Sequence, residues 1–267
     1  MIAADPLTIE GIRRQLKSEN AERHLYLFAE VTSTNSCLCD LARRGARDGS
    51  VVIADTQRAG RGRRGQRWFS PPGVNLYASV LSRPDITARE LTPFSFIASL
   101  ALSDAIDALG VAATIKWPND VLVDGKKVAG ALVECGMRGE HVEYVILGIG
   151  VNVNVSRDAL EAALGPAAGF ATSLNAALGH EVDRNVLLAA WLDRLDAWLL
   201  TWTREGEMAI RRAWADRDIL TGRRVEVRGN GPAFEGRVLG VAATGHLVVE
   251  DSLGQLHHLT NEEVRLS

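Results

Sequence analysis

An Asp-Gly pair at positions 124 and 125, with short apolar stretches on both sides, constrains the fold of this chain more than any other local feature. Such a pair favours the two-residue turn of a β-hairpin, because both positions accept a positive φ. The turn predicts a register in which Leu122 faces Lys127 and Asp120 faces Ala129. Alternation along the strands then brings Asp120 and Lys127 to one face, diagonal to each other.

The same face of this hairpin has a second unusual feature. Lys126 points to the opposite face. On its own, the pair formed by Lys127 and Asp120 would be an ordinary surface ion pair. However, Gly130 is expected opposite Asn119, where the missing side chain leaves room for a ligand or another backbone. Residues 148–152, Gly-Ile-Gly-Val-Asn, combine glycines with a polar group in the same way. Glycine gaps beside polar groups on neighbouring strands predict a pocket.

The rest of residues 1–219 shows both strand and helix periodicity. We expect strands at residues 24–31, 50–54, 75–81, 114–117, 121–123, 127–134 and 143–155, and helices at 7–16, 37–44, 93–109, 185–202 and from there to about 217. This order predicts an α+β fold, with helices packed on a mixed β-sheet.

The texture of the sequence changes after residue 219. Three short strands, at 225–227, 236–239 and 247–250, are separated by glycine-containing turns. This pattern predicts a small β-barrel over residues 220–267, following a larger domain over residues 1–219.

Composition excludes several classes of protein. The chain is 46% hydrophobic and 24% charged with a net charge of −3, as in packed globular proteins. No apolar run approaches the roughly 20 residues that a membrane span needs, so we expect no membrane association. Asp5, Pro6 and Glu10 interrupt the place where a signal peptide would be apolar, which predicts a cytoplasmic protein. Three cysteines and six histidines show no zinc-type spacing, so no structural metal is expected.

Residues 55–73 form a segment rich in arginine and glycine between two predicted strands, and it allows several interpretations. Residues 60–65 match G-x-G-x-x-G, but a dinucleotide-binding turn must open a helix, and here Pro-Pro-Gly and a strand follow. An RNA-binding loop would place its arginines on phosphates and stack bases on Trp68 or Phe69, although the chain is net acidic. A third interpretation is a local cradle for phosphate or carboxylate, and a fourth is a solvated loop without a ligand.

Four motifs together resemble the biotin protein ligases, also called biotin–acetyl-CoA-carboxylase ligases. They are Ser-Thr-Asn at 33–35, Gln57 followed by Gly-Arg-Gly-Arg-Arg-Gly at 60–65, Lys-Trp-Pro-Asn-Asp at 116–120 with Lys127 and Gly130, and Gly-x-Gly-x-Asn at 148–152. They occur in the family's order and approximate spacing. The resemblance implies a mixed sheet with helices followed by a small SH3-like barrel. It also implies a monofunctional member without the DNA-binding domain of some relatives, and hence no nucleic-acid partner.

Site residues follow from the resemblance. Those implied to bind biotin are Ser33, Thr34, Asn35, Gln57, Gly60, Arg61, Gly62, Arg63, Lys127, Gly130 and Gly148. Those implied to bind the nucleotide are Arg63, Trp68, Asn119, Lys127, Asn152 and Phe170. Lys127, Arg63 and Asp120 are the implied catalytic residues, and no metal ligand is assigned. Gln66 stands where some relatives have a basic residue, and Phe170 stands where some have a tryptophan.

The implied reaction has two steps. ATP, with Mg²⁺, activates biotin to biotinyl-5′-AMP, and a lysine of a biotin carboxyl carrier domain then takes the biotinyl group. The protein is expected to act as a monomer or a homodimer. Ligation of lipoate or octanoate is the alternative within the superfamily, and RNA binding through the arginine-glycine segment is the alternative from another class.

Overall fold

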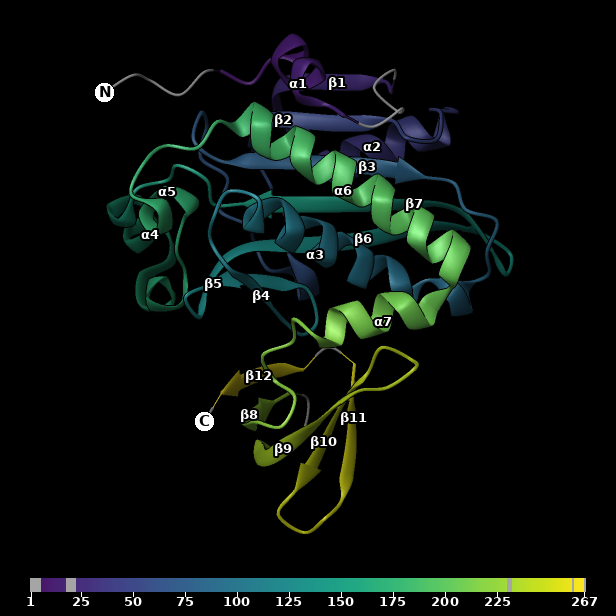
Figure 1. Ribbon diagram of the computed structural model, residues 1–267, viewed down its shortest axis with the longest axis vertical. Coiled ribbons are helices and arrows are strands. Elements are labelled where there is room, and N and C mark those ends of the chain that lie inside the picture. The colour runs from purple at the N-terminus through teal and green to yellow at the C-terminus, as the bar shows by residue number, and fades with distance from the viewer. Residues whose placement is uncertain (1–5, 18–22, 230–231, 261, 267) are drawn as a thin grey trace.

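The computed structural model describes residues 6–17, 23–229, 232–260 and 262–266. Its main element is a seven-stranded mixed sheet in the order β1-β2-β3-β7-β6-β5-β4 (Figure 1). The strands are β1 (Leu25–Val31), β2 (Val51–Gln57), β3 (Leu76–Ser82), β4 (Ala113–Lys116), β5 (Asp120–Val123), β6 (Lys126–Arg138) and β7 (His141–Val151). β1 and β2 pair in parallel, and the remaining neighbours pair antiparallel. The predicted α+β arrangement is confirmed.

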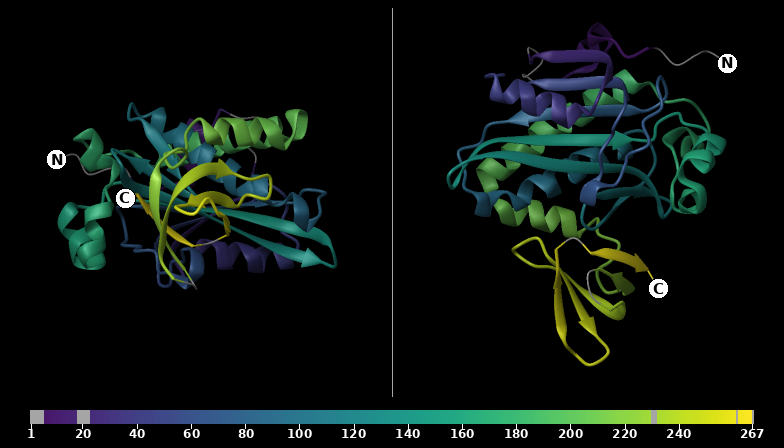
Figure 2. Two further views of the ribbon diagram at one scale, coloured as in Figure 1. Left: turned by 90° about the horizontal axis from the view of Figure 1, so that it is seen from below. Right: turned by 180° about the vertical axis from the view of Figure 1, so that it is seen from behind.

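Helices cover the two faces of this sheet unequally (Figures 1 and 2). α3 (Thr92–Asp107) and α6 (Arg184–Glu205) pack on one face, with α7 (Glu207–Ala215) against α3 and α1 (Ile9–Gln15) against α6. α2 (Thr34–Arg43) packs on β2, β3 and β7 from the other face. The shorter helices are α4 (Arg157–Leu164) and α5 (Leu174–Leu178), with 3₁₀ turns η2 (Arg63–Gly65), η3 (Ala88–Glu90) and η4 (Gly165–Phe170).

Strand alternation explains how both faces are filled. On β3, Leu76 and Val80 are buried in the large core beneath α3 and α6, whereas Leu81 joins a smaller cluster with Leu38 of α2. The α2 layer covers only part of its face among the described residues. The Ser-Thr-Asn motif lies at the start of α2, and the glycines at positions 148 and 150 of β7 lie on the same face of the sheet.

The hairpin that the sequence predicts is present between β5 and β6, with one change of register. Asp124 and Gly125 have φ of 50° and 72°, as a primed turn requires, and Leu122 faces Lys127 as expected. Beyond that pair the register shifts, because β6 carries one extra residue as a β-bulge. Asp120 therefore faces Gly130 rather than Ala129.

The bulge also corrects the expected partner of Asn119. The residue does not lie opposite Gly130. Instead its carbonyl accepts a hydrogen bond from the amide of Ala131, at 3.0 Å. The glycine gap in the hairpin face is consequently directly beside the carboxylate of Asp120.

The C-terminal residues form a second, antiparallel sheet below α7 (Figure 1). Its strands are β8 (Arg224–Arg228), β9 (Phe234–Val241), β10 (Leu247–Asp251), β11 (Leu256–Leu259) and β12 (Glu263–Leu266), in the order β11-β10-β9-β8-β12. Within the described residues, β11 and β12 are the two ends of this sheet, so strand pairing does not close it into a barrel. Its buried side chains, such as Val225 and Leu247, belong to the same hydrophobic core as the large sheet.

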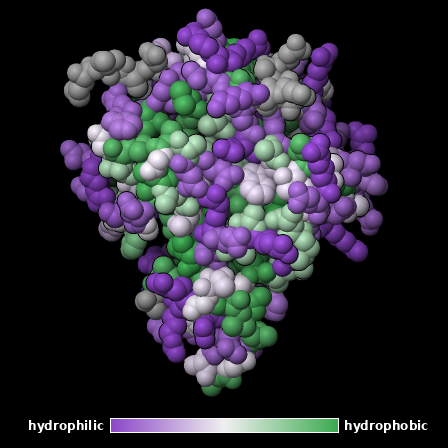
Figure 3. All heavy atoms as spheres, viewed as in Figure 1, coloured by the Kyte–Doolittle hydropathy of each residue, from purple (hydrophilic) through white to green (hydrophobic). Residues whose placement is uncertain are grey.

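Figure 3 colours one face of the molecule by hydropathy. On the face drawn in Figure 3, hydrophilic residues in purple lie between smaller groups of hydrophobic residues in green. Among the helices of the described residues, none has both the length and the hydropathy that a membrane span requires.

Candidate functional site

The first part of the site is where α2 begins. Ser33 occupies the N-cap position, and Thr34 donates its backbone N–H to Oε1 of Gln57 at 2.9 Å. The hydroxyl of Ser79 lies 2.8 Å from Oγ1 of Thr34 and 2.6 Å from Oδ1 of Asn35. These side chains come from α2, β2 and β3, and all but Gln57 are buried. The structure thus joins the Ser-Thr-Asn motif to the glutamine motif through direct hydrogen bonds.

Asn35 extends this network across the sheet to the arginine-glycine segment. Its amide donates to Oε2 of Glu134 at 2.8 Å, and the same oxygen forms an ion pair with Arg61 at 2.6 Å. A Cβ atom at Gly148 would lie 1.9 Å from Oδ1 of Asn35, so this glycine is required for the side chain to lie on β7. Gly148 and Arg61 are therefore brought together with Asn35.

Ser79 and Glu134 are part of this network but were not among the predicted residues. A signal for Glu134 exists in the sequence, since it lies four positions after Gly130 on one strand and therefore on the same face. Ser79 is a small polar residue in the middle of an apolar strand, and nothing in its local pattern distinguishes it from a satisfied core serine.

Trp68 connects the arginine-glycine segment to the glycines of β7. A Cβ at Gly150 would lie 2.6 Å from the indole, and a Cβ at Gly60 would lie 2.7 Å from the Trp68 carbonyl. The ammonium of Lys127 lies 5.3 Å from the indole ring centroid, within cation–π distance. Within the described residues, the buried Nε1 of Trp68 has no hydrogen-bond partner. The tryptophan therefore presents an unused donor in the site.

Positive charge collects around one carboxylate. Lys127 Nζ lies 2.6 Å from Oδ1 of Asp120. Burial lowers the pKa of Lys116 despite the opposing field of Asp120, and Lys127 lowers it further. Burial also lowers the pKa of Arg63, which the field of Asp120 again opposes. Glu262 and Glu263 are further acidic neighbours of Arg63 and Lys116. A cluster of cations of this kind suits a polyanionic ligand.

Arg63 lies at a cleft between the two sheets. Its guanidinium donates to the carbonyl of Thr260 at 3.1 Å and lies 5.8 Å from the ring centroid of Trp117. The cleft has a volume of about 290 Å³, and Phe96, Trp117, Asn119 and His246 contribute to its lining. Arg63 and Trp68, five residues apart, therefore reach two different parts of the site.

The predicted nucleotide-binding amides are engaged with backbone in this structure. Asn119 donates its side-chain amide to the carbonyl of Ala131, and Asn152 donates to the carbonyl of Thr172 at 3.0 Å. Thr172 in turn donates its N–H to the Lys127 carbonyl at 2.9 Å, which brings residues 170–172 beside the hairpin. The Phe170 side chain is 70% exposed there.

The remaining predicted residues lie in or beside the loop. Gly62 donates its N–H to the Gln66 carbonyl at 2.7 Å, and Arg61 and Arg67 form a backbone bridge, so residues 61–67 fold into a compact turn. A strand follows this turn rather than a helix, which confirms that it is not a dinucleotide-binding turn. Gly130 has ordinary space around it, because the nearest atom to an added Cβ would be Lys127 Cε at 3.5 Å.

No cluster of three or more histidine, cysteine, aspartate or glutamate side chains suited to a metal ion occurs in the described residues. Asp120 pairs with Lys127 and has Lys116 as its cross-strand partner. Such a site suits Mg²⁺ that arrives bound to phosphates, because this ion keeps several waters and often uses only one or two protein carboxylates.

Comparison with known proteins agrees with this geometry. Residues 27–152 match the model of the biotin/lipoate A/B protein ligase family. The biotin–[acetyl-CoA-carboxylase] ligase of Paracoccus denitrificans is 36% identical over 86% of this chain and 95% of its own length. The bifunctional ligase/repressor BirA of Bacillus spizizenii is 33% identical over 93% of this chain and 76% of its own length.

A solved structure is similar over most of this chain. The biotin protein ligase from Aquifex aeolicus, in complex with biotin and ATP, superposes with a TM-score of 0.74 and 26% identity, covering 91% of this chain and 99% of that one. All the resembling motifs lie within the matched residues, and the structure gathers them on one face of the sheet. This chain belongs to the biotin protein ligases of the biotin/lipoate A/B protein ligase family.

Proposed function

We propose that this chain carries out the reaction for which its relatives are named. It activates biotin with ATP to biotinyl-5′-AMP and pyrophosphate, and it then transfers the biotinyl group to a lysine of a biotin carboxyl carrier domain. The observation that carries the proposal is the group of cations near Asp120: Lys127 pairs with its carboxylate, Lys116 is its cross-strand partner, and Arg63 lines the adjoining cleft. This charge excess lies beside the polar and aromatic surface of Asn35 and Trp68, where a small ligand can bind.

In the first step, the biotin carboxylate attacks the α-phosphorus of ATP and pyrophosphate leaves. Both reactants are anions, so the main task is to hold them together against repulsion. Lys127 is within reach of both the Trp68 surface and Asp120, and it stabilises the charge that develops on the phosphoryl oxygens. Mg²⁺ would arrive with the ATP substrate, where Asp120 could supply a carboxylate ligand and the metal would neutralise phosphate charge.

The biotin head is assigned to the network at the start of α2. A ureido ring needs both donors and acceptors, and Ser33, Thr34, Asn35 and Gln57 supply hydroxyl and amide groups of both kinds. Gly148 makes room for the Asn35 side chain, and Gly130 leaves the sheet surface open beside Asp120. Gly60, Arg61 and Gly62 belong to the loop that covers this surface, with Arg61 held there by Glu134.

The nucleotide is assigned to the hairpin side of Lys127. Arg63 and Asn119 lie on the cleft between the sheets, and Asn152 fixes the segment that carries Phe170. The exposed ring of Phe170 is available to pack on an adenine base. Its position beside the Lys127 backbone supports that role.

In the second step, the ε-amine of the carrier lysine attacks the carbonyl carbon of the mixed anhydride and AMP leaves. The enzyme forms no covalent bond to biotin. An ordered loop over residues 58–74 keeps water from the anhydride, since hydrolysis would waste the intermediate. We infer that residues 1–219 carry this chemistry in the cytoplasm. The C-terminal sheet, in residues 220–267, is an open form of an SH3-like barrel.

Two alternatives predict different ligands. Lipoate or octanoate would use a similarly placed lysine, whereas an RNA-binding loop would present its arginines to solvent. Arg61 and Arg63 instead contact Glu134 and the Thr260 carbonyl, which disfavours RNA.

Calorimetric titration with biotin, lipoate and a polyribonucleotide in parallel separates these functions. Of the three ligands, we expect only biotin to give heat of binding. Saturable binding of lipoate without binding of biotin would change the substrate, and binding of the polyribonucleotide alone would replace the enzyme with a binding protein.

A further inference from the structure

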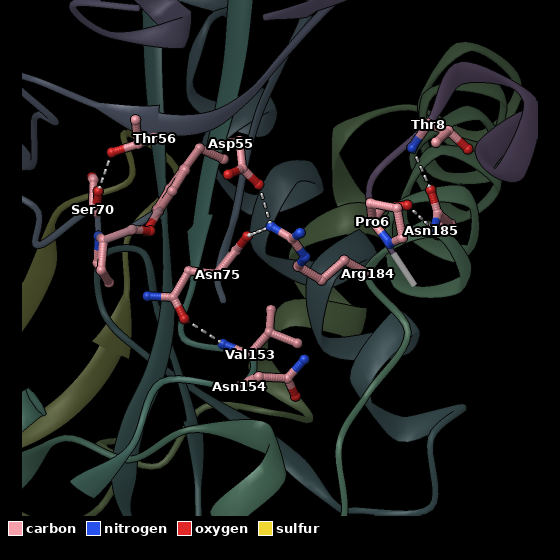
Figure 4. A network of polar contacts seen from close by, with 12 residues as sticks. Pro6, Thr8, Asp55, Thr56, Ser70, Asn75, Val153, Asn154, Arg184 and Asn185 are labelled. Atoms are coloured by element: carbon pink, nitrogen blue, oxygen red, sulfur yellow. Dashed lines mark hydrogen bonds and ion pairs between the residues drawn. The ribbon is translucent and has the colours of Figure 1, made fainter. Parts of the chain in front are cut away.

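A buried polar network lies behind the site, where α6 begins (Figure 4). Arg184 is the first residue of α6, and its side chain is 4% exposed. Its Nη1 lies 2.7 Å from Oδ1 of Asp55 and donates to the carbonyl of Asn75 at 3.1 Å. Arg184 is buried, whereas the Asp55 side chain is 34% exposed. Desolvation of the guanidinium offsets part of the attraction, so the pair is weak evidence for a purely stabilising role.

Asp55 and Asn75 mark the two stems of the arginine-glycine loop. Asp55 lies near the end of β2, and Asn75 immediately precedes β3. The segment between these strands carries Arg63 and Trp68. A single side chain from α6 thus ties both ends of the loop together, although it is more than a hundred positions away in the sequence.

Further hydrogen bonds connect the two strands to residues within the loop. The hydroxyl of Thr56 donates to the Ser70 carbonyl at 2.6 Å, and the hydroxyl of Tyr77 donates to the Pro71 carbonyl at 3.0 Å. Burial raises the pKa of Tyr77, which keeps its hydroxyl protonated and able to donate. Ser70 is two residues from Trp68, so these contacts link both strands to the residue whose indole packs at Gly150.

We propose that Arg184 is a positioning residue for the ligase. It fixes the separation of the two stems through Asp55 and Asn75, and so it holds the loop closed over the bound adenylate. The inference rests on the proposed function, because it assigns Arg184 a part in retaining that intermediate.

The test compares Arg184→Met, Arg184→Lys and Asp55→Asn with Arg23→Met. Arg23 is a matched control, since its side chain is 3% exposed and pairs with Asp196 further along α6. The adenylate is formed on each protein from biotin and Mg·ATP, and its dissociation rate is followed after a rapid change to ligand-free buffer. Thermal melting of the same samples reports stability.

We expect Arg184→Met to release the adenylate about tenfold faster than wild type, because small misplacements in a site of this kind have large effects. Arg184→Lys keeps the charge and should recover part of the loss. Arg23→Met should lower the melting temperature while its release rate stays within about twofold of wild type. The double variant Arg184→Met with Asp55→Asn should release no faster than Arg184→Met alone, because the two residues act as one pair.

The positioning role would be overturned if Arg184→Met released the adenylate at the wild-type rate. It would also be overturned if Arg23→Met accelerated release as much as Arg184→Met does. If Arg184→Met does not fold, Asp55→Asn carries the same test, because that side chain is 34% exposed and tolerates the change better. A wild-type protein that forms no adenylate from biotin and ATP would overturn the proposed function, and with it this inference. The wild-type and variant arms thus distinguish the two failures.

Discussion

Two adjacent lysines on β6 have different surroundings, although they are chemically identical. Lys127 forms an ion pair with Asp120 and lies over Trp68, whereas Lys126 is exposed beside the turn. Their side chains diverge because neighbouring residues of a strand point to opposite faces. The chemistry assigned to one should therefore not be shared by the other.

Replacing Lys127 with alanine should nearly abolish adenylate formation. A charge-assisted contact to developing phosphoryl charge in a closed site contributes roughly 1.5–3 kcal/mol or more. Lys126→Ala is the control and should retain most of the activity. Pyrophosphate release with biotin and ATP measures both variants, and an equal loss in the two would contradict the strand-face assignment.

Replacing Arg63 with glycine should leave adenylate formation largely intact but weaken its retention. The substitution removes a guanidinium from the loop and adds conformational freedom to a segment that already contains several glycines. A released acyl phosphate reacts with accessible lysines, so the variant should biotinylate serum albumin in the same tube. Streptavidin blotting detects this labelling. If albumin stays unlabelled and the adenylate dissociates at the wild-type rate, Arg63 does not help to retain the intermediate.

At the scale of elements, the pairing of β6 with β7 decides which residues form the site. Leu132 faces Gly148 and Gly130 faces Gly150, so three glycines lie on one face of these two strands. Asn35 fills the space above Gly148, whereas the space above Gly130 has no atom closer than 3.5 Å to an added Cβ. The two glycines therefore differ in what a methyl group would meet.

Gly148→Ala should destabilise the fold, and Gly130→Ala should not. The new methyl group at position 148 would displace the buried amide of Asn35 and its hydrogen bonds, at a cost of about 1–3 kcal/mol. At position 130 the methyl group makes ordinary contacts. Urea denaturation of both variants measures the difference, and equal midpoints would show that Asn35 is not held against β7 as described.

The elements that sequence reasoning predicted are those with strong local signals. The turn at Asp124 and the periodic helix over residues 185–202 were both recognised, because the residues that determine them are adjacent in the chain. The bulge that shifts Asp120 to Gly130 was missed, since it depends on how β6 meets two neighbouring strands. β11 and β12 were missed because they are short and contain several polar or charged residues.

The site residues could be predicted only in part from the sequence. The structure brings the motif residues together, and their binding roles stay predictions. Ser79 and Glu134 were not found, because their roles depend on contacts between elements distant in the sequence. The family motifs gave no indication that Arg184 acts on the site, because its proposed effect reaches the site only through Asp55 and Asn75.

At the scale of the whole molecule, the C-terminal sheet is attached close to the site. Trp117 donates its indole N–H to the Gly245 carbonyl at 3.0 Å, and Arg63 donates to the Thr260 carbonyl. The two sheets also share one hydrophobic core. The position of the small sheet is therefore coupled to the side chains that surround Asp120.

Trp117→Phe should loosen this attachment. The change removes a hydrogen bond and leaves a small cavity, with an expected loss of about 1–3 kcal/mol. Limited proteolysis should then cut more readily within residues 224–266 than in the wild type. Trp198→Phe is the control, because Trp198 donates to Asp104 within the large domain. Faster cleavage of the C-terminal sheet in both variants, or in neither, would contradict the coupling.

Exchange of labelled pyrophosphate into ATP tests the central claim most directly, because it reports reversible formation of the adenylate and nothing later. With purified wild-type protein and Mg·ATP, we predict that biotin supports exchange, that lipoate and octanoate do not, and that Lys127→Ala removes the signal. Exchange that depends on lipoate or octanoate instead of biotin, or no exchange with any of the three acids, would contradict the account.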